Sequence, residues 1–189
     1  MRVKARVYDV DSFWEFVHRP ENADKHLELL DGEIIEMPAP GEEHGFLAGL
    51  FYHHFLLFDP ERKMGVPTVE SGYYTLDDHY TVLAPDAAFR LRERADAPLN
   101  KRWVSTMPDI AVEIKSPKDS LAQMRRKAAI YLRHGAQLVW IVIPDKKNVE
   151  VCRLDDNGSI QNEVINADDS LSGESVLPGF ELELSSLFN

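Results

Sequence analysis

Residues 109–115 alternate between apolar and polar side chains, and this segment constrains the fold more than any other. Such alternation predicts a β-strand, because strand side chains point to opposite faces in turn. The apolar face, at positions 110, 112 and 114, is expected to enter a core, whereas the other face carries Glu113 and Lys115. Buried charge is costly unless it is paired or binds a metal. The pair therefore indicates a functional site, and the alternative is an ordinary Glu–Lys pair on the solvated face of an edge strand.

The segment after this strand predicts a helix and a second buried strand. Residues 120–134 have apolar side chains at helical spacing, and Gly135 stands where a helix commonly ends. Residues 138–143 form a continuous apolar run that stops at Pro144. A run of this kind is typical of a strand that is buried on both faces.

The rest of the chain predicts further short elements. Helices are expected at 9–18, capped by Asp11 or Ser12, and at 42–58. The Asp31-Gly32 pair predicts a hairpin over 27–37. Residues 91–107 are interpreted as a loop. The remaining expected strands lie near 68–75 and 81–90, the second containing Pro85-Asp86, and in an antiparallel set at 149–154, 160–165 and 181–184.

Length and composition predict one soluble domain spanning residues 1–189. Cys152 is the only cysteine, which excludes an intrachain disulfide and fits a reducing, cytoplasmic location. The N-terminus lacks the apolar stretch of a signal peptide, and no apolar run is long enough to cross a membrane.

The net charge of −11 argues against a nucleic-acid partner, since lysine and arginine supply most of the affinity for phosphates. The cations nevertheless concentrate in two windows, 90–102 and 115–127, each directly after a segment that carries a candidate acid. The cations of these windows either contact the phosphates of a nucleic acid or belong to two solvated charged loops.

Asp86 and Glu113 are expected to lie on two different strands, and Asp86 is therefore the better partner for Glu113. Asp109 is also on the strand of Glu113, but it is about 13 Å away along an extended chain and cannot share a cation with it.

The order helix, strand, strand, strand, helix, strand, with Pro-Asp in the second strand and Glu-x-Lys in the third, resembles the restriction-endonuclease-like PD-(D/E)XK core. A series of short motifs follows in order over roughly residues 10–188: Glu28–Glu33, Met37–Pro40, His44, Pro85-Asp86, Pro108–Pro117, Lys127–Tyr131, Gly135 and Val139–Pro144. Their ordered combination resembles more narrowly the Uma-two family of that superfamily. The resemblance implies an α/β fold with a mixed central sheet flanked by helices, extended by N- and C-terminal strands.

The resemblance implies a metal-dependent nuclease, and the leading interpretation is an endonuclease that hydrolyses DNA. Asp86 and Glu113 are expected to bind Mg²⁺ or Mn²⁺, which prefer oxygen ligands, with the backbone carbonyl of Ile114 as a further donor. Lys115 is expected to orient the attacking water or to offset charge in the transition state. Family members often lack a lysine at this position and keep one in the following helix, where this chain has Lys127.

Three accessory residues have two interpretations each. Lys127 reaches toward the acids, or its stem covers the core while its ammonium meets water. His44 is a proton shuttle or phosphate contact, or it is structural. Glu28 belongs to the site, or it is plain surface.

Other functions remain open at this point. The chain is alternatively a catalytically silent nuclease-fold module that binds nucleic acid or protein, or a small-molecule phosphoesterase. A homodimer is a further expectation, built on the 139–143 strand and the C-terminal β segments.

Overall fold

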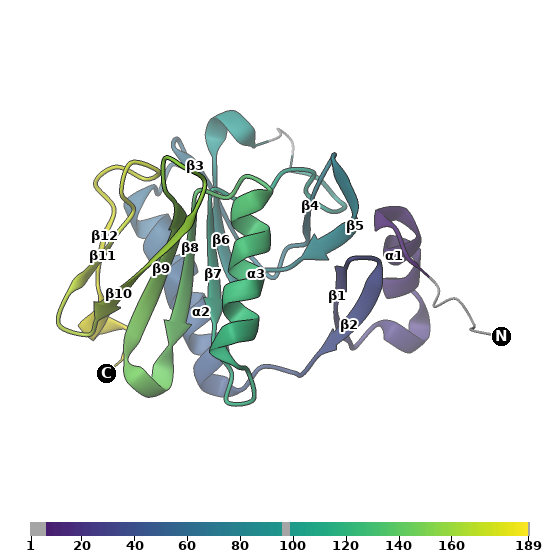
Figure 1. The fold of residues 1–189 in the computed structure, drawn as a ribbon, viewed down its shortest axis with the longest axis horizontal. Helices are drawn as coiled ribbons and strands as arrows, with labels where there is room; N and C mark the ends of the chain where they lie inside the picture. Colours follow the sequence, from purple (N-terminus) through teal and green to yellow (C-terminus); the bar gives the residue numbers. More distant parts are fainter. Residues whose placement is uncertain (1–6, 96–98, 189) are drawn as a thin grey trace.

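A six-stranded mixed sheet forms the centre of the computed structural model, which describes residues 7–95 and 99–188 (Figure 1). β7 and β8 are parallel, and the other neighbours are antiparallel. In spatial order the strands are β10 (Ile160–Asn166), β9 (Asn148–Leu154), β8 (Leu138–Ile143), β7 (Ile110–Ile114), β6 (Ala87–Leu91) and β3 (Gly65–Val69).

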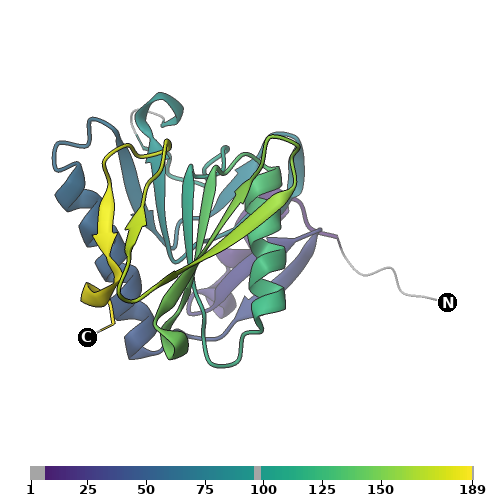
Figure 2. The same ribbon diagram turned by 60° about the vertical axis from the view of Figure 1, so that its left-hand side comes forward.

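Helices cover both faces of this sheet (Figures 1 and 2). On one face, α2 (Glu42–Phe58) and the small β11 (Ser170–Ser172)–β12 (Glu181–Glu183) ladder enclose a core that contains the apolar side of β7. On the other face, α3 (Leu121–Arg133) packs over Ala111 and Val139. The two faces of β7 therefore enter separate cores, whereas the alternation predicted a core only on the apolar face.

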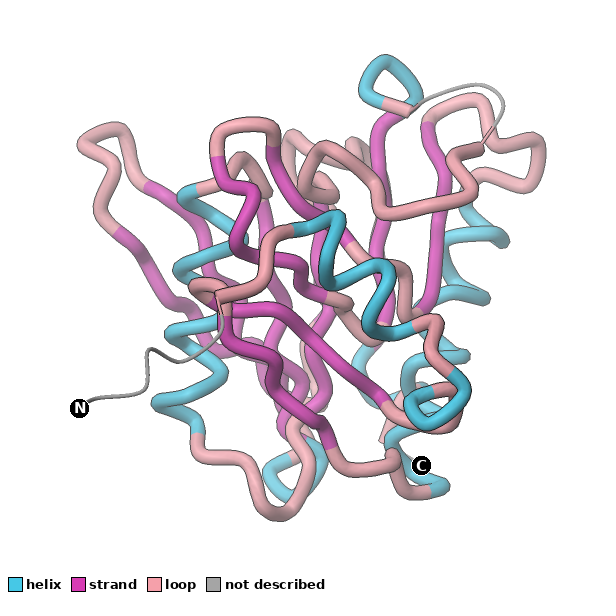
Figure 3. The backbone as a smooth tube through the Cα atoms, turned by 90° about the vertical axis from the view of Figure 1, so that its right-hand side faces the viewer, coloured by secondary structure: helices cyan, strands magenta, loops and turns pink. Residues whose placement is uncertain are grey.

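A second sheet lies beside the first (Figure 3). Its strands have the spatial order β2, β1, β5, β4. Helix α1 packs on it through Val10 and Phe13. Asp31 and Gly32 both have positive φ, 51° and 80°, and they form the turn of the predicted hairpin. The bounds are α1 (Val10–Val17), β1 (His26–Leu30), β2 (Glu33–Met37), β4 (Tyr73–Thr75) and β5 (Asp78–Leu83).

Short 3-10 turns complete the chain at Pro20–Asn22, Arg92–Arg94, Pro144–Lys146 and Leu184–Ser186. No helix within residues 7–95 and 99–188 is long and apolar enough to cross a membrane.

Three predictions about local structure need correction. The cap of α1 is Asp9, whose carboxylate accepts the Ser12 N–H, rather than Asp11 or Ser12. The two strands expected over 68–75 and 81–90 are four, and Pro85-Asp86 lies between β5 and β6 instead of inside a strand. Proline has no N–H to donate to a ladder, and the chain passes here from the small sheet to the central one.

The C-terminal strands also differ from the prediction. β9 and β10 form the expected antiparallel pair, but 181–183 pairs with 170–172 in a separate ladder. β8 is hydrogen-bonded to β7 on one side and β9 on the other. The 139–143 strand therefore has no free edge with which to build a dimer.

Candidate functional site

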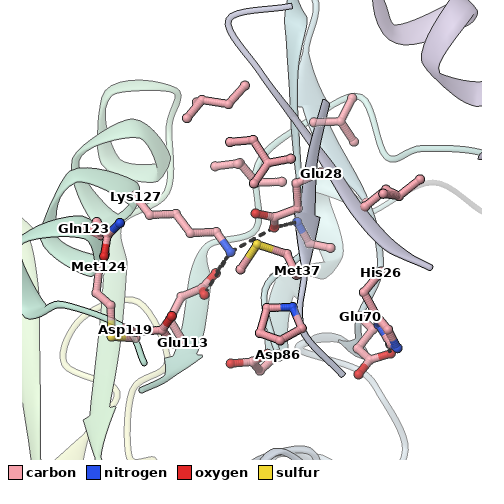
Figure 4. Close-up of a pocket in the computed structure, with 18 of the residues that line it drawn as sticks. His26, Glu28, Met37, Glu70, Asp86, Glu113, Asp119, Gln123, Met124 and Lys127 are labelled. Atoms are coloured by element: carbon pink, nitrogen blue, oxygen red, sulfur yellow. Dashed lines mark hydrogen bonds and ion pairs between the residues drawn. The ribbon is translucent and has the colours of Figure 1, made fainter. Parts of the chain in front are cut away.

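Five of the six predicted site residues line one cavity of about 790 Å³. Its walls come from β1, the end of β7 and α3, together with residues at the start of α2 and between β5 and β6. Figure 4 shows Lys127 reaching between Glu28 and Glu113, with Asp86 beside them. The five residues are Glu28, His44, Asp86, Glu113 and Lys127.

Glu113 is the most enclosed member of the group. It lies on the α3 side of β7 and is 6% exposed. The Tyr131 hydroxyl donates to its Oε1 at 2.7 Å, and Lys127 Nζ lies 2.9 Å from both Oε1 and Oε2. Burial raises the pKa of Glu113 to about 8, because Lys127 only partly offsets the desolvation and the nearby Asp86 and Glu28 raise the pKa further.

Lys127 joins the two sheets through its ammonium group. It projects from α3, which begins at a capping box between Ser120 and Gln123. Its Nζ lies 2.8 Å from Glu28 Oε1, in addition to its contacts with Glu113. Burial alone would lower the pKa of Lys127, but the two carboxylates outweigh it and raise the pKa above the usual value, which keeps the side chain charged.

Glu28 comes from β1 of the small sheet. Its Oε1 also accepts the Ala84 N–H at 2.7 Å, next to the point where the chain leaves β5. Glu28 is 6% exposed, so it is a buried member of the cluster rather than plain surface.

Asp86 lies against the end of β7. Its Oδ2 accepts the Ile114 N–H at 2.6 Å and also lies 3.2 Å from His44 Nε2. His44 belongs to the first turn of α2. The hydrogen bond to Asp86 raises the pKa of His44 above its usual value, although burial opposes it.

Lys115 lies apart from this group. It follows the last residue of β7, its Nζ donates to the Ser116 carbonyl at 3.1 Å, and it does not line the cavity. The structure therefore brings Lys127 rather than Lys115 to the carboxylates.

Asp109 has a separate set of partners and does not line the cavity. It is fully buried, pairs with Arg94, and accepts the Leu91 N–H at 2.7 Å and Gln137 Nε2 at 2.8 Å. The expectation that Asp109 is no partner for Glu113 is confirmed.

Several cations of the two basic windows form ion pairs within the chain. Arg94, Arg102 and Arg125 pair with carboxylates of Asp109, Asp11 and Glu150. Of the cations in these windows, Arg126 and Lys127 line the cavity. Lys25 lines it as well, and the sequence interpretation did not single it out.

The donor set suits a hard divalent cation that keeps several waters. Within residues 7–95 and 99–188, no group of three or more His, Cys, Asp or Glu side chains is arranged to hold a metal ion. Asp86 and Glu113 offer two carboxylates on one cavity, and Mg²⁺ is usually held by one or two carboxylates together with waters and substrate phosphates. These two residues therefore fit such an ion.

Comparison with known proteins identifies the family. A model of the Uma2 family, described as "Putative restriction endonuclease", matches residues 13–185. The chain belongs to this family. The fold is similar to a crystal structure described as "a putative nuclease belonging to DUF820" from Anabaena variabilis ATCC 29413, with a TM-score of 0.77 and 21% identity over 96% of this chain and 97% of that one. A search among curated proteins finds no match. The Uma-two resemblance and the predicted α/β fold are both confirmed.

Proposed function

We propose that this member of the Uma2 family is a divalent-metal-dependent endonuclease that hydrolyses DNA phosphodiester bonds. The observation that supports it is an excess of negative charge in one cavity. Asp86 and Glu28 both act electrostatically on Glu113, and Lys127 contacts both Glu28 and Glu113. Buried carboxylates without compensation are costly, and a bound divalent cation would balance them.

In this proposal Asp86 and Glu113 hold Mg²⁺ or Mn²⁺, which supplies polarisation of the phosphate and a lower pKa for a bound water. Asp86 is fixed by the Ile114 N–H, and Glu113 by Tyr131 and Lys127. Contacts from different elements thus hold both carboxylates in place before a ligand binds. A metal site needs this preorganisation of its ligands.

We assign the role of the active-site lysine to Lys127. Its Nζ lies 2.9 Å from Glu113, so a phosphate bound beside that carboxylate would be within reach of a charged donor. Lys115 was the candidate from the sequence pattern, and its bond to the Ser116 carbonyl gives it no such place.

His44 and the other cavity cations complete the assignment. His44, 3.2 Å from Asp86, is placed to pass a proton to or from a group in the cavity. Lys25 and Arg126 would contact phosphate oxygens.

A second candidate is a nuclease-fold module that binds nucleic acid or protein without cutting. Lys127 occupies acceptor sites on both oxygens of Glu113, and a lysine there can compensate the carboxylate in place of a metal. A small-molecule phosphoesterase is a further candidate, because a cavity of about 790 Å³ has the size of a small-ligand site. Homodimer formation, the cytoplasmic location and the single-domain organisation stay predictions.

Cleavage of supercoiled plasmid with Mg²⁺ or Mn²⁺ tests the proposal. We expect nicked and linear DNA from the wild type, and at least a hundredfold slower cleavage from Glu113→Gln. The matched control is Glu183→Gln, a change at an exposed glutamate on β12, which should cleave like the wild type. Equal rates for all three proteins, or no metal-dependent cleavage by any, would refute the nuclease proposal. Salt-sensitive DNA binding without cleavage would favour the binding module.

A further inference from the structure

Tyr131 is one of the two side chains that fix Glu113 in the proposed site, and the other is Lys127. Tyr131 is fully buried on α3, and its hydroxyl donates to Glu113 Oε1 at 2.7 Å. Lys127 stands one helical turn earlier, so both side chains reach the same carboxylate from one side of the helix. The Lys127 ammonium also lies 6.0 Å from the Tyr131 ring centroid.

The hydrogen bonds on Glu113 distinguish its two oxygens. A carboxylate has about four lone-pair sites. Oε1 accepts from Tyr131 and lies 2.9 Å from Lys127, whereas Oε2 has Lys127 as its one donor among residues 7–95 and 99–188. Oε1 is therefore filled, and Oε2 keeps an acceptor site for a further partner.

The two donors differ in charge. Lys127 is a cation, and it competes electrostatically with any other cation that approaches Glu113. Tyr131 donates as a neutral hydroxyl, so it can hold the carboxylate in one orientation without opposing a metal.

We infer that Tyr131 is a positioning residue, which holds Oε1 of Glu113 so that Oε2 is directed to a divalent cation. This inference rests on the proposed function, since it takes Glu113 as a metal ligand. Partners that orient a ligating side chain typically contribute ten- to a hundredfold to metal affinity or activity. A purely structural tyrosine would contribute to folding and leave metal affinity unchanged.

Binding of Mn²⁺ to the metal-free full-length chain tests it, with free Mn²⁺ followed by its electron paramagnetic resonance signal. We expect Tyr131→Phe to weaken binding about tenfold. When Tyr131→Phe is added to Glu113→Gln, the affinity for Mn²⁺ should differ from that of Glu113→Gln alone by less than about twofold. The reason is that Glu113→Gln has already removed the carboxylate that Tyr131 orients. Tyr80→Phe is the matched control, since Tyr80 is 52% exposed on β5, and it should bind like the wild type.

The outcomes separate this inference from the proposed function. Wild-type affinity in Tyr131→Phe, or an equal loss in both backgrounds, would overturn the role of Tyr131 and leave the metal site standing. A wild type that binds no Mn²⁺ would overturn both. Thermal unfolding of each metal-free variant checks its fold, and Tyr131→Met removes the hydroxyl with a flexible apolar side chain if the phenylalanine variant is unfolded.

Discussion

Replacement of Lys127 by methionine should destabilise the protein more than any single surface change. Methionine keeps most of the apolar stem and removes the ammonium. Glu28 and Glu113 are each 8% exposed at the side chain, and Lys127 is 18% exposed. The change therefore leaves two enclosed carboxylates without the cation that lies between them.

The expected loss follows from this enclosure. Removing one partner of a buried ion pair costs about 3–5 kcal/mol, because the remaining charge is buried without compensation. Here one ammonium serves two carboxylates, so we expect a loss of about 3–5 kcal/mol in the free energy of unfolding at about pH 9, above the pKa of Glu113. The loss should shrink in acid, where protonation makes the carboxylates neutral.

Urea denaturation measures this loss as a lower midpoint with an unchanged slope. The matched control is Lys115→Met, which removes an ammonium bonded only to the Ser116 carbonyl within the part of the chain described. We expect that control to lose less than about 1 kcal/mol. A loss below about 1 kcal/mol in Lys127→Met, or equal losses in the two variants, would refute the view that Lys127 neutralises a desolvated acidic cluster.

Two further predictions concern residues outside the cavity. Asp109→Ala should lower the free energy of unfolding, measured by urea denaturation, by about 3 kcal/mol, because Arg94 and the Leu91 N–H lose their buried acceptor. The folded variant should still cleave DNA at the wild-type rate. Slower cleavage would place Asp109 in the catalytic machinery. Burial, together with the nearby Glu150, raises the pKa of the Cys152 thiol from 9.0 to about 12, although Arg125 and Arg153 oppose the shift. The thiol should therefore resist a disulfide reagent at pH 8 until urea unfolds the chain. Because the unfolded thiol ionises first, the free energy of unfolding should fall above about pH 9, and Cys152→Ala should remove that part of the decline.

Local patterns predicted the elements that carry the site. The limits of α2 match the prediction, Ser120 caps α3, and Gly135 ends it with φ 100°. The alternation of residues 109–115 placed Glu113 on the face opposite the apolar residues, and the structure shows that α3 covers this face.

The choice of lysine depends on tertiary geometry that no local pattern contains. Lys115 has the period-two relation to Glu113, but β7 ends at Ile114 and the ammonium turns to the neighbouring carbonyl. Lys127 and Tyr131 have the spacing of one helical turn, and the sequence reading assigned Tyr131 to the apolar stripe. Only the crossing of α3 over β7 shows that both side chains reach one carboxylate.

Glu28 and Asp86 depend on the same kind of information. Glu28 belongs to the small sheet, and it reaches the cavity because β1 pairs with β5 at Leu29 and Val82. Asp86 reaches it because the chain passes between the sheets at Pro85. A strand pattern read along the chain does not reveal that two sheets share one cavity.

The location of a bound cation tests the central claim most directly. Crystals of the protein soaked in Mn²⁺ should give an anomalous peak within about 2.0–2.6 Å of carboxylate oxygens of both Asp86 and Glu113. The same peak should be absent from crystals of Glu113→Gln. A peak held by other residues, or no peak in this cavity at millimolar Mn²⁺, would contradict the account.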